Sequence, residues 1–320
     1  MYQIIAVPII LSLVAVYVLI SIILLLYPTL IHTEKETRVR CRQISHRGGC
    51  GEALENTIMA FRHSLKAGTE MLQIDVRMTA DGQVVVCHDN DLTRLTGVNQ
   101  KLSELKYEEL PPLLDKLEVF HDPGVFVEAR RKSNEIPLLS TVFTQFHKIP
   151  ICIQVKEDSD ELIEKTNELI VRFKRKDYTI WGSASAKISN KCHKQNAEIP
   201  LYFSVAHCFG LIILLYSGML PFVKLKESFL LVAFPKVMLR RFPSSRIMKV
   251  FTYAADWLLL SPILIRHLRK RGIQTYIWVL NKKDEFTLAF EKLGAAGVMT
   301  DYPTELSDYV EQSVKSKRWQ

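Results

Sequence analysis

The sequence predicts an α/β fold, in which short strands alternate with helices, behind a single N-terminal membrane helix. Three observations carry this prediction. The run from Ile4 to Leu26 contains no charged residue, short β-type runs recur from Gln43 onward, and polar residues stand at or near the ends of several of these runs. Periodicity does not distinguish a (β/α)8 barrel from a doubly wound sheet, so both architectures remain open at this point.

The N-terminal run has the length of a membrane span. About 20 apolar residues cross the hydrocarbon core of a bilayer. A cleaved signal peptide would usually show a shorter apolar region, a basic residue before it and a small-residue cleavage site, none of which is clear here. No Lys or Arg precedes the run, whereas Lys35, Arg38, Arg40 and Arg42 follow it, which predicts a cytosolic body. We therefore expect an anchor over residues 1–32 and a basic juxtamembrane linker over 33–42.

Residues 43–310 form the predicted catalytic domain, followed by a tail over 311–320. One helix is expected where Leu54, Ile58, Phe61 and Leu65 make an apolar face before Gly68. The expected strands are Gln43–Ser45, Met71–Val76, Val84–Cys87, Ile151–Lys156, Tyr178–Trp181, Leu201–Ser204, Trp257–Leu260, Thr275–Leu280 and Gly297–Met299.

Two segments interrupt the alternation. Residues 90–137 are rich in charged and turn-forming residues and are interpreted as an insertion after the strand that ends at His88. Residues 208–223 are apolar, but a crossing there would place strands of one domain on opposite sides of the membrane. We expect a membrane-dipping loop or helical hairpin near the active-site mouth, with a buried helix as the alternative. The basic cluster Lys236, Arg240, Arg241 and Arg246 would rest on anionic head groups or form a solvated helix face.

Composition limits the possible partners. The net charge of +8 suits nucleic acid, an anionic membrane or an acidic substrate, but the absence of a nucleic-acid recognition motif argues against the first. Six scattered cysteines without a CxxC pair, and the lack of an Asn-x-Ser/Thr sequon, favour reduced thiols in the cytosol. No protein partner is inferable.

Polar side chains gather at the ends of the expected strands. Because strand side chains alternate, Gln73 and Asp75 would share the lumen side of one strand, and Gln154 and Lys156 that of another. Buried polar groups without partners cost about 1–3 kcal/mol each, so such a cluster needs a function.

Two histidines, an arginine and a lysine suit phosphoryl transfer. Arg47 and Lys156 would hold phosphate oxygens, and His46 and His88 would shuttle protons because histidine titrates near neutral pH. Either histidine alone is more often an ordinary loop or strand-end residue. Their joint occurrence favours the catalytic interpretation.

These residues resemble the glycerophosphodiester phosphodiesterases. The resemblance rests on His46-Arg47-Gly48, Glu55-Asn56, His88-Asp89, Trp278-Val279-Leu280-Asn281 and Gly297-Val298-Met299-Thr300-Asp301, and it covers about residues 44–302. It is strongest to small membrane-bound mammalian members that act as lysophospholipases D. It implies a TIM barrel, His46 and His88 as acid and base, Trp278 near the glycerol unit and a divalent metal, Mg²⁺ or Ca²⁺. It also implies hydrolysis of lysophospholipids, or of N-acyl ethanolamine phospholipids, in the endoplasmic reticulum or perinuclear membrane.

The chain departs from the family pattern at two metal-ligand positions. Gln73 and Gln154 occupy positions at which the family has acidic residues. A carboxamide oxygen can ligate Mg²⁺ or Ca²⁺ but brings no negative charge. The expected metal site therefore consists of Asp75 and His88, with Glu55 as a further candidate, and weakened binding is expected. The rival hypothesis is a lipid-binding pseudoenzyme that retains the barrel.

Overall fold

Eight parallel strand positions surround the centre of the molecule and form a closed barrel. The computed structural model describes residues 2–129, 134–234, 239 and 245–317. In spatial order the sheet contains β7 (Thr179–Gly182), β6 (Ile151–Val155), β2 (Met71–Met78), β1 (Gln43–Ser45), β10 (Gly297–Thr300), β9 (Gln274–Trp278) and β8 (Phe229–Ala233). Neighbouring strands in this order pair in parallel. Parallel bridges from Trp181 to Leu201 and from Tyr202 to Phe229 supply the eighth position and close the ring. The (β/α)8 barrel is confirmed, and the doubly wound sheet is excluded.

One of the expected strands is helical in the structure, and another is a strand outside the barrel. Residues 257–259 end the helix α9 (Arg246–Leu259), which begins where the Ser245 hydroxyl accepts a hydrogen bond from the Met248 N–H. The barrel strand that sequence periodicity missed is β8. The expected strand at Val84 is β3 (Val84–Val86), which pairs antiparallel with β2 as a hairpin and lies outside the ring of parallel strands.

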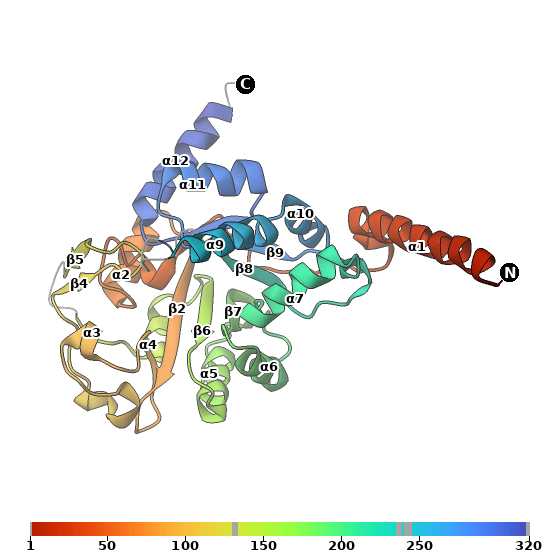
Figure 1. Cartoon of the computed structure of the whole chain (residues 1–320). Coiled ribbons are helices and arrows are strands. Elements are labelled where there is room, and N and C mark those ends of the chain that lie inside the picture. Colours follow the sequence, from red (N-terminus) through yellow and green to blue (C-terminus); the bar gives the residue numbers. More distant parts are fainter. Residues whose placement is uncertain (1, 130–133, 235–238, 240–244, 318–320) are drawn as a thin grey trace.

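Helices pack against the outward faces of the strands (Figure 1). Leu72, Ile74 and Ile153 contribute to one core cluster with Phe61 and Phe143, and all five are fully buried. The expected alternation of side chains along β2 and β6 is therefore correct. The helices that follow strands are α2 (Ile58–Lys66), α4 (Leu139–Gln145), α5 (Asp160–Arg172), α6 (Ala186–Gln195), α10 (Pro262–Lys270), α11 (Lys283–Thr287) and α12 (Pro303–Lys317).

The inside of the barrel divides into an apolar and a polar layer. Ile44, Met71, Cys152 and Tyr276 belong to an apolar cluster between the strands. Polar side chains follow at the carboxyl ends of the strands, which is the end at which TIM barrels carry their active sites.

The N-terminal helix α1 (Tyr2–Leu26) projects from the barrel beside helix α7 (Val205–Tyr216) (Figure 1). Its stretch from residue 7 to 26 is long and apolar enough to cross a membrane, a property that signal sequences share. The Tyr17 hydroxyl donates to the Ser217 carbonyl at 2.6 Å, and the Ser21 hydroxyl donates to the Gly218 carbonyl at 2.7 Å. These bonds fix the end of α7 against the middle of α1.

The apolar segment at 208–223 consists of most of α7 and a short 3₁₀ turn, Leu220–Phe222. Helix α7 is shorter than a membrane span. The alternative of a buried helix is wrong, because Phe209, Ile213 and Tyr216 each expose more than half of their surface.

The predicted insertion at 90–137 contains the short helix α3 (Thr93–Thr96) and a two-stranded hairpin of β4 (Lys116–Glu118) and β5 (Phe126–Glu128); residues 130–133 lie outside the described part. Lys236, Arg240 and Arg241 of the basic cluster also lie outside it, while Arg246 begins α9 and is exposed. Residues 311–317 of the predicted tail continue α12, and 318–320 are not described.

Candidate active site

A tight turn after β1 brings His46 and Arg47 to the mouth of the barrel. The strand ends at Ser45, and the backbone then takes positive φ at Arg47 (49°), Gly48 (79°) and Gly49 (80°). A Cβ atom on Gly48 would lie 2.6 Å from the Phe61 ring, so both the backbone conformation and the space require glycine there. The turn leaves His46 5% and Arg47 3% exposed.

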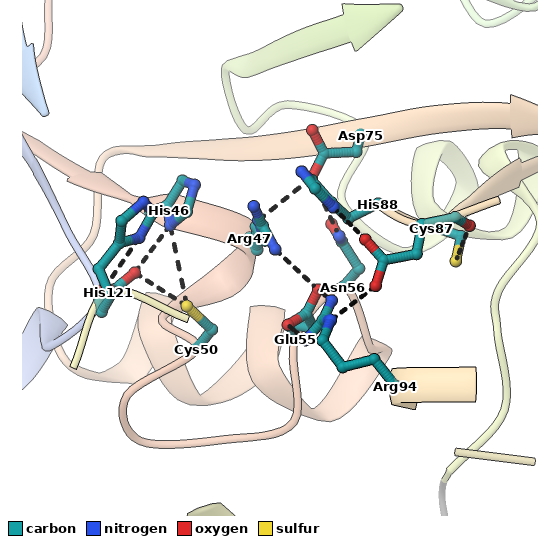
Figure 2. A network of polar contacts seen from close by, with 12 residues as sticks. His46, Arg47, Cys50, Glu55, Asn56, Asp75, Cys87, His88, Arg94 and His121 are labelled. Carbon is teal, nitrogen blue, oxygen red and sulfur yellow. Dashed lines mark hydrogen bonds and ion pairs between the residues drawn. The ribbon is translucent and has the colours of Figure 1, made fainter. Parts of the chain in front are cut away.

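The Arg47 side chain and backbone connect three parts of the site. Its Nη1 donates to Glu55 Oε1 at 3.0 Å, and its Nε lies 3.5 Å from Asp75 Oδ2. Its backbone N–H donates to Gln73 Oε1 at 2.9 Å. The guanidinium also lies 5.1 Å from the ring centroid of Phe120 in the insertion. Figure 2 shows Arg47 between the histidine cluster around His46 and the ionic network around Glu55.

Asp75 lies at the centre of the polar layer and is fully buried. Asn56 Nδ2 donates to its Oδ2 at 3.2 Å, Gln73 Nε2 donates to its Oδ1 at 3.3 Å, and Lys156 Nζ lies 3.8 Å from Oδ1. Burial opposes ionisation of this carboxyl, but the positive charge of Arg47 lowers its pKa to about 2. Asp75 is therefore an anion at neutral pH.

Glu55 is shared by two arginines. It accepts from Arg47 Nη1 at 3.0 Å and from Arg94 Nη1 at 2.8 Å, and Arg94 Nε also donates to Asp89 at 2.6 Å. His88 Nδ1 contacts the other oxygen of Asp89. Burial opposes ionisation of Glu55, but Arg47 and Arg94 lower its pKa to about 2. Both Glu55 oxygens are thus engaged by guanidinium groups.

His46 forms a buried pair with Asp301, which follows β10. The Nδ1 atom lies 2.7 Å from Asp301 Oδ1, and because that carboxylate has its pKa held well below the ordinary value, Nδ1 must carry the proton. Burial lowers the pKa of His46 to about 4. The imidazole is therefore neutral at pH 7, and among the described residues no hydrogen bond engages its Nε2 lone pair. The Nδ1 of His88 pairs in the same way with Asp89, and burial lowers the pKa of His88 as well.

Three further residues complete this side of the site and were missed as site residues in the sequence. Asp301 stood within a family motif but had no assigned role. Phe120 and His121 lie in the loop that joins β4 to β5, where no periodicity or motif marked them. The His121 ring centroid lies 5.0 Å from that of His46, and its Nδ1 lies 3.6 Å from Asp301 Oδ2. The insertion therefore covers the histidine from one side.

The remaining predicted residues lie within the same region. Lys156 directly follows β6 and reaches Asp75. Trp278 ends β9, and its ring centroid lies 6.3 Å from that of His46. The strands thus bring His46, Arg47, Asp75, Lys156 and Trp278 together, and His88 joins them from the end of the β3 hairpin.

A cavity of about 240 Å³ opens beside this polar cluster. His46, Gln73, Gln154 and Trp278 line its inner part. Its outer wall is apolar and comes from Phe203, α7, β8 and the end of α9. The residues from these three elements include Val205, Cys208, Phe209, Leu231 and Leu259. A polar group and an apolar chain could therefore lie in one continuous space.

Three described residues could in principle hold a metal ion: His46, Cys50 and Asp301, whose candidate ligand atoms lie within 4.8 Å of one another. Their contacts are those of a hydrogen-bonded cluster, since Cys50 Sγ donates to Asp301 Oδ1 at 2.8 Å and His46 Nδ1 shares the same oxygen. Burial raises the pKa of Cys50 well above its ordinary value, so the thiolate form that metals prefer is disfavoured.

Comparisons with known proteins agree with the fold and with the motifs. The profile of the glycerophosphoryl diester phosphodiesterase family matches residues 46–305. Human lysophospholipase D GDPD1 is 46% identical over 92% of this chain and 94% of its own length, and mouse lysophospholipase D GDPD3 is 38% identical over 92% and 90%. Among solved structures, a putative glycerophosphoryl diester phosphodiesterase from Silicibacter pomeroyi superposes with a TM-score of 0.60 at 18% identity, covering 88% of this chain and 96% of that chain. An Oleispira antarctica phosphodiesterase in complex with sn-glycerol-3-phosphate gives 0.58 at 17% identity, over 85% and 97%.

Replacement of Glu55 by Gln should destabilise the fold. The change leaves Arg47 and Arg94 with one fewer anionic partner, and breaking a buried ion pair costs about 3–5 kcal/mol. Because the folded pKa of Glu55 is depressed, its stabilising effect is present above its unfolded pKa near 4.5 and is lost as the pH falls toward about 2. Urea unfolding of Glu55→Gln should therefore show a lower free energy of unfolding at pH 7 and a weaker pH dependence below 4.5.

The exposed pair of Glu161 and Lys165 provides the control: Glu161→Gln should change stability by less than about 0.5 kcal/mol. Equal effects of the two variants would contradict the ionic network.

Proposed function

Because the chain belongs to the glycerophosphoryl diester phosphodiesterase family, we propose that it hydrolyses lysoglycerophospholipids as a lysophospholipase D. The resemblance found in the sequence is confirmed by the family match, and with it the class of phosphoric diester hydrolases. In the proposed reaction the oxygen of water bonds to phosphorus, the bond from phosphorus to the head-group oxygen breaks, and that oxygen gains a proton. The products are lysophosphatidic acid and a free head-group alcohol.

The two histidines suit the proton transfers of this reaction. In each, Nδ1 is oriented by a carboxylate, Asp301 for His46 and Asp89 for His88. The unprotonated Nε2 of one can accept a proton from the attacking oxygen, while the other, once protonated, can supply one to the leaving group. Arg47 and Lys156 would bind the phosphate oxygens, and Trp278 would contact the glycerol unit beside His46.

The apolar cavity is the observation that carries the lysolipid assignment. Its inner part contains His46 and Trp278, and its outer wall is formed by apolar side chains of α7, β8 and α9. A glycerophosphodiester without an acyl chain would leave this wall exposed to water, whereas a single-chain lipid would cover it. The cavity thus supports a substrate with one polar end and one acyl chain.

Choline release from lysophosphatidylcholine by the detergent-solubilised full chain tests this assignment. Ala184 is exposed and lines the cavity mouth, so Ala184→Trp should narrow the entrance without disturbing the core. We expect this variant to lose at least about tenfold in kcat/KM for lysophosphatidylcholine, equivalent to roughly 1.4 kcal/mol, and to retain most of its activity on glycerophosphocholine. The neighbouring Ser185→Trp is the control, because Ser185 is exposed but does not line the cavity. Equal losses on both substrates would argue against an acyl-chain site.

Asp301→Asn tests the proposed role of His46. The carboxamide can stabilise the wrong tautomer of His46, so kcat should fall by about 10²–10⁴-fold with a small change in KM. The acid limb of the pH profile assigned to His46, expected near its pKa of about 4, should also shift. Asp308→Asn on the exposed side of α12 is the matched control. A loss confined to KM would contradict a positioning role.

We also propose that α1 anchors the protein and that the end of α7 enters the membrane. Tyr17 and Ser21 lie nine and five residues before Leu26, which is about 13 and 7 Å along a helix. Their hydrogen bonds to Ser217 and Gly218 would hold this turn at the same depth as the middle of the anchor. Such contacts favour a retained helix over a cleaved signal sequence. The cavity mouth at α7 would then face the bilayer in which the substrate dissolves.

Protease treatment of sealed microsomes checks the proposed orientation. The positive residues after α1 predict a cytosolic body on the endoplasmic reticulum or perinuclear membrane. External protease should therefore digest residues 43–310 without detergent and leave the anchor region in the pellet after carbonate washing. Protection of the body until detergent is added would contradict a cytosolic orientation. A lumenal marker protein verifies that the microsomes are sealed.

A lipid-binding pseudoenzyme is the second candidate, favoured by the carboxamides of Gln73 and Gln154 in the polar layer. Choline release from lysophosphatidylcholine separates the enzyme from the pseudoenzyme. Turnover by the unmutated chain supports the enzyme, whereas turnover that appears only in Gln73→Glu/Gln154→Glu supports the pseudoenzyme.

A further inference from the structure

The polar contacts described for the Asp75 side chain all come from hydrogen-bond donors or cations. Asn56 and Gln73 donate their amide hydrogens to its two oxygens. Arg47 Nε and Lys156 Nζ lie 3.5 and 3.8 Å from the same carboxylate. A metal ligand must direct a free lone pair toward the ion. Here a divalent cation would instead have to displace amide hydrogens and approach two positive charges.

The orientation of the Gln73 amide is determined by its neighbour. The backbone N–H of Arg47 can only donate, so the atom 2.9 Å away must be the Gln73 oxygen. The amide nitrogen therefore points to Asp75 Oδ1, 3.3 Å away. A glutamate in this position would place a second carboxylate oxygen near that point, and two anionic oxygens so close repel each other unless a cation or a proton lies between them. Glutamine removes this repulsion.

Gln154 lies beside Asp75 on the neighbouring strand. Its Cα is the register partner of Asp75 in the pairing of β2 with β6, and its side chain lines the cavity. Like Gln73, it brings an amide group and no charge to the polar layer.

The connected ionic network is already electroneutral. It contains the three cations Arg47, Arg94 and Lys156 and the three carboxylates Glu55, Asp75 and Asp89, joined by ion pairs. Two added glutamates would give a net charge of −2, which is the charge that one divalent cation balances. The two glutamines and the balanced network are therefore consistent with each other and with a site that needs no such ion.

The family typically depends on a divalent metal, but the expected ligands Asp75, His88 and Glu55 do not fit one here. Asp75 faces donors and Glu55 is engaged by two guanidinium groups, which leaves only the Nε2 of His88, whose Nδ1 binds Asp89. One neutral nitrogen does not hold Mg²⁺ or Ca²⁺, which prefer several oxygen ligands. We infer that this site binds a phosphate or phosphodiester group without a divalent cation, with positive charge supplied by Arg47 and Lys156. The choice of phosphate as the ligand rests on the proposed function.

Thermal unfolding of the full chain in detergent tests the cation directly. Millimolar Mg²⁺ or Ca²⁺ should leave the Tm of the unmutated protein unchanged relative to chelator. In Gln73→Glu/Gln154→Glu the same ions should raise Tm by on the order of 3 °C, because a ligand that binds only the folded state stabilises it. The surface pair Gln145→Glu/Gln195→Glu adds the same charge elsewhere and should show no such rise. A rise in the unmutated protein that Asp75→Asn abolishes would overturn the inference.

Calorimetric binding of sn-glycerol 3-phosphate in the presence of chelator tests the anion. Binding should occur without added cation. In Lys156→Met the affinity should fall by at least about tenfold, because one charge-assisted contact to the phosphate is lost. Lys165→Met, on the surface of α5, is the control and should bind normally. Binding only after addition of Mg²⁺ or Ca²⁺, or no binding under either condition, would overturn the inference. Both measurements are independent of turnover, so an inactive protein that binds this phosphate in chelator would refute the proposed hydrolysis and leave the cation-free site intact.

Discussion

The buried charge of Arg47 is the constraint on which the polar layer depends. A guanidinium that is only 3% exposed must be paired, because leaving it unpaired away from water would cost several kcal/mol. Glu55 and Asp75 supply the pairing, and Phe120 covers the planar group from the insertion. One side chain thereby ties the loop after β1, the strand β2 and the insertion to a single arrangement.

The mouth of the barrel has two sides, a polar one formed by the ionic network and an apolar one formed by the cavity wall. On one side, ionised carboxylates with depressed pKa values meet arginine and lysine; on the other, α7 and the end of α9 offer an apolar wall. His46 lies where the two meet, with its Nδ1 bound to Asp301 and its ring beside Trp278. The contact of α1 with the end of α7 places the apolar side nearest the N-terminal helix. The fold and helix α1 together thus orient the mouth, with its apolar side toward α1.

The errors in the sequence interpretation have identifiable causes. Residues 257–260 form a short apolar run, and such a run does not by itself distinguish a strand from the last turn of an amphipathic helix. In the structure the Ser245 side chain caps a long helix, and this helix continues to Leu259, so residues 257–259 are helical. Phe229–Ala233 was missed for the converse reason: its five consecutive apolar residues show no alternation, as is usual for a parallel strand that is buried on both faces.

The sequence by itself determined the apolar N-terminal helix, most of the strands and the two glutamines at expected ligand positions. These features depend on local period and side-chain charge, which neighbouring residues carry. Only the tertiary structure decided that Asp301, 255 residues away in sequence, orients His46. It also decided that His121 and Phe120 cover the site. The hydrogen bonds that Asp75 accepts from Asn56 and Gln73 likewise appear only in the folded chain. Such pairings arise when the barrel closes, since closure brings the ends of distant strands to one rim.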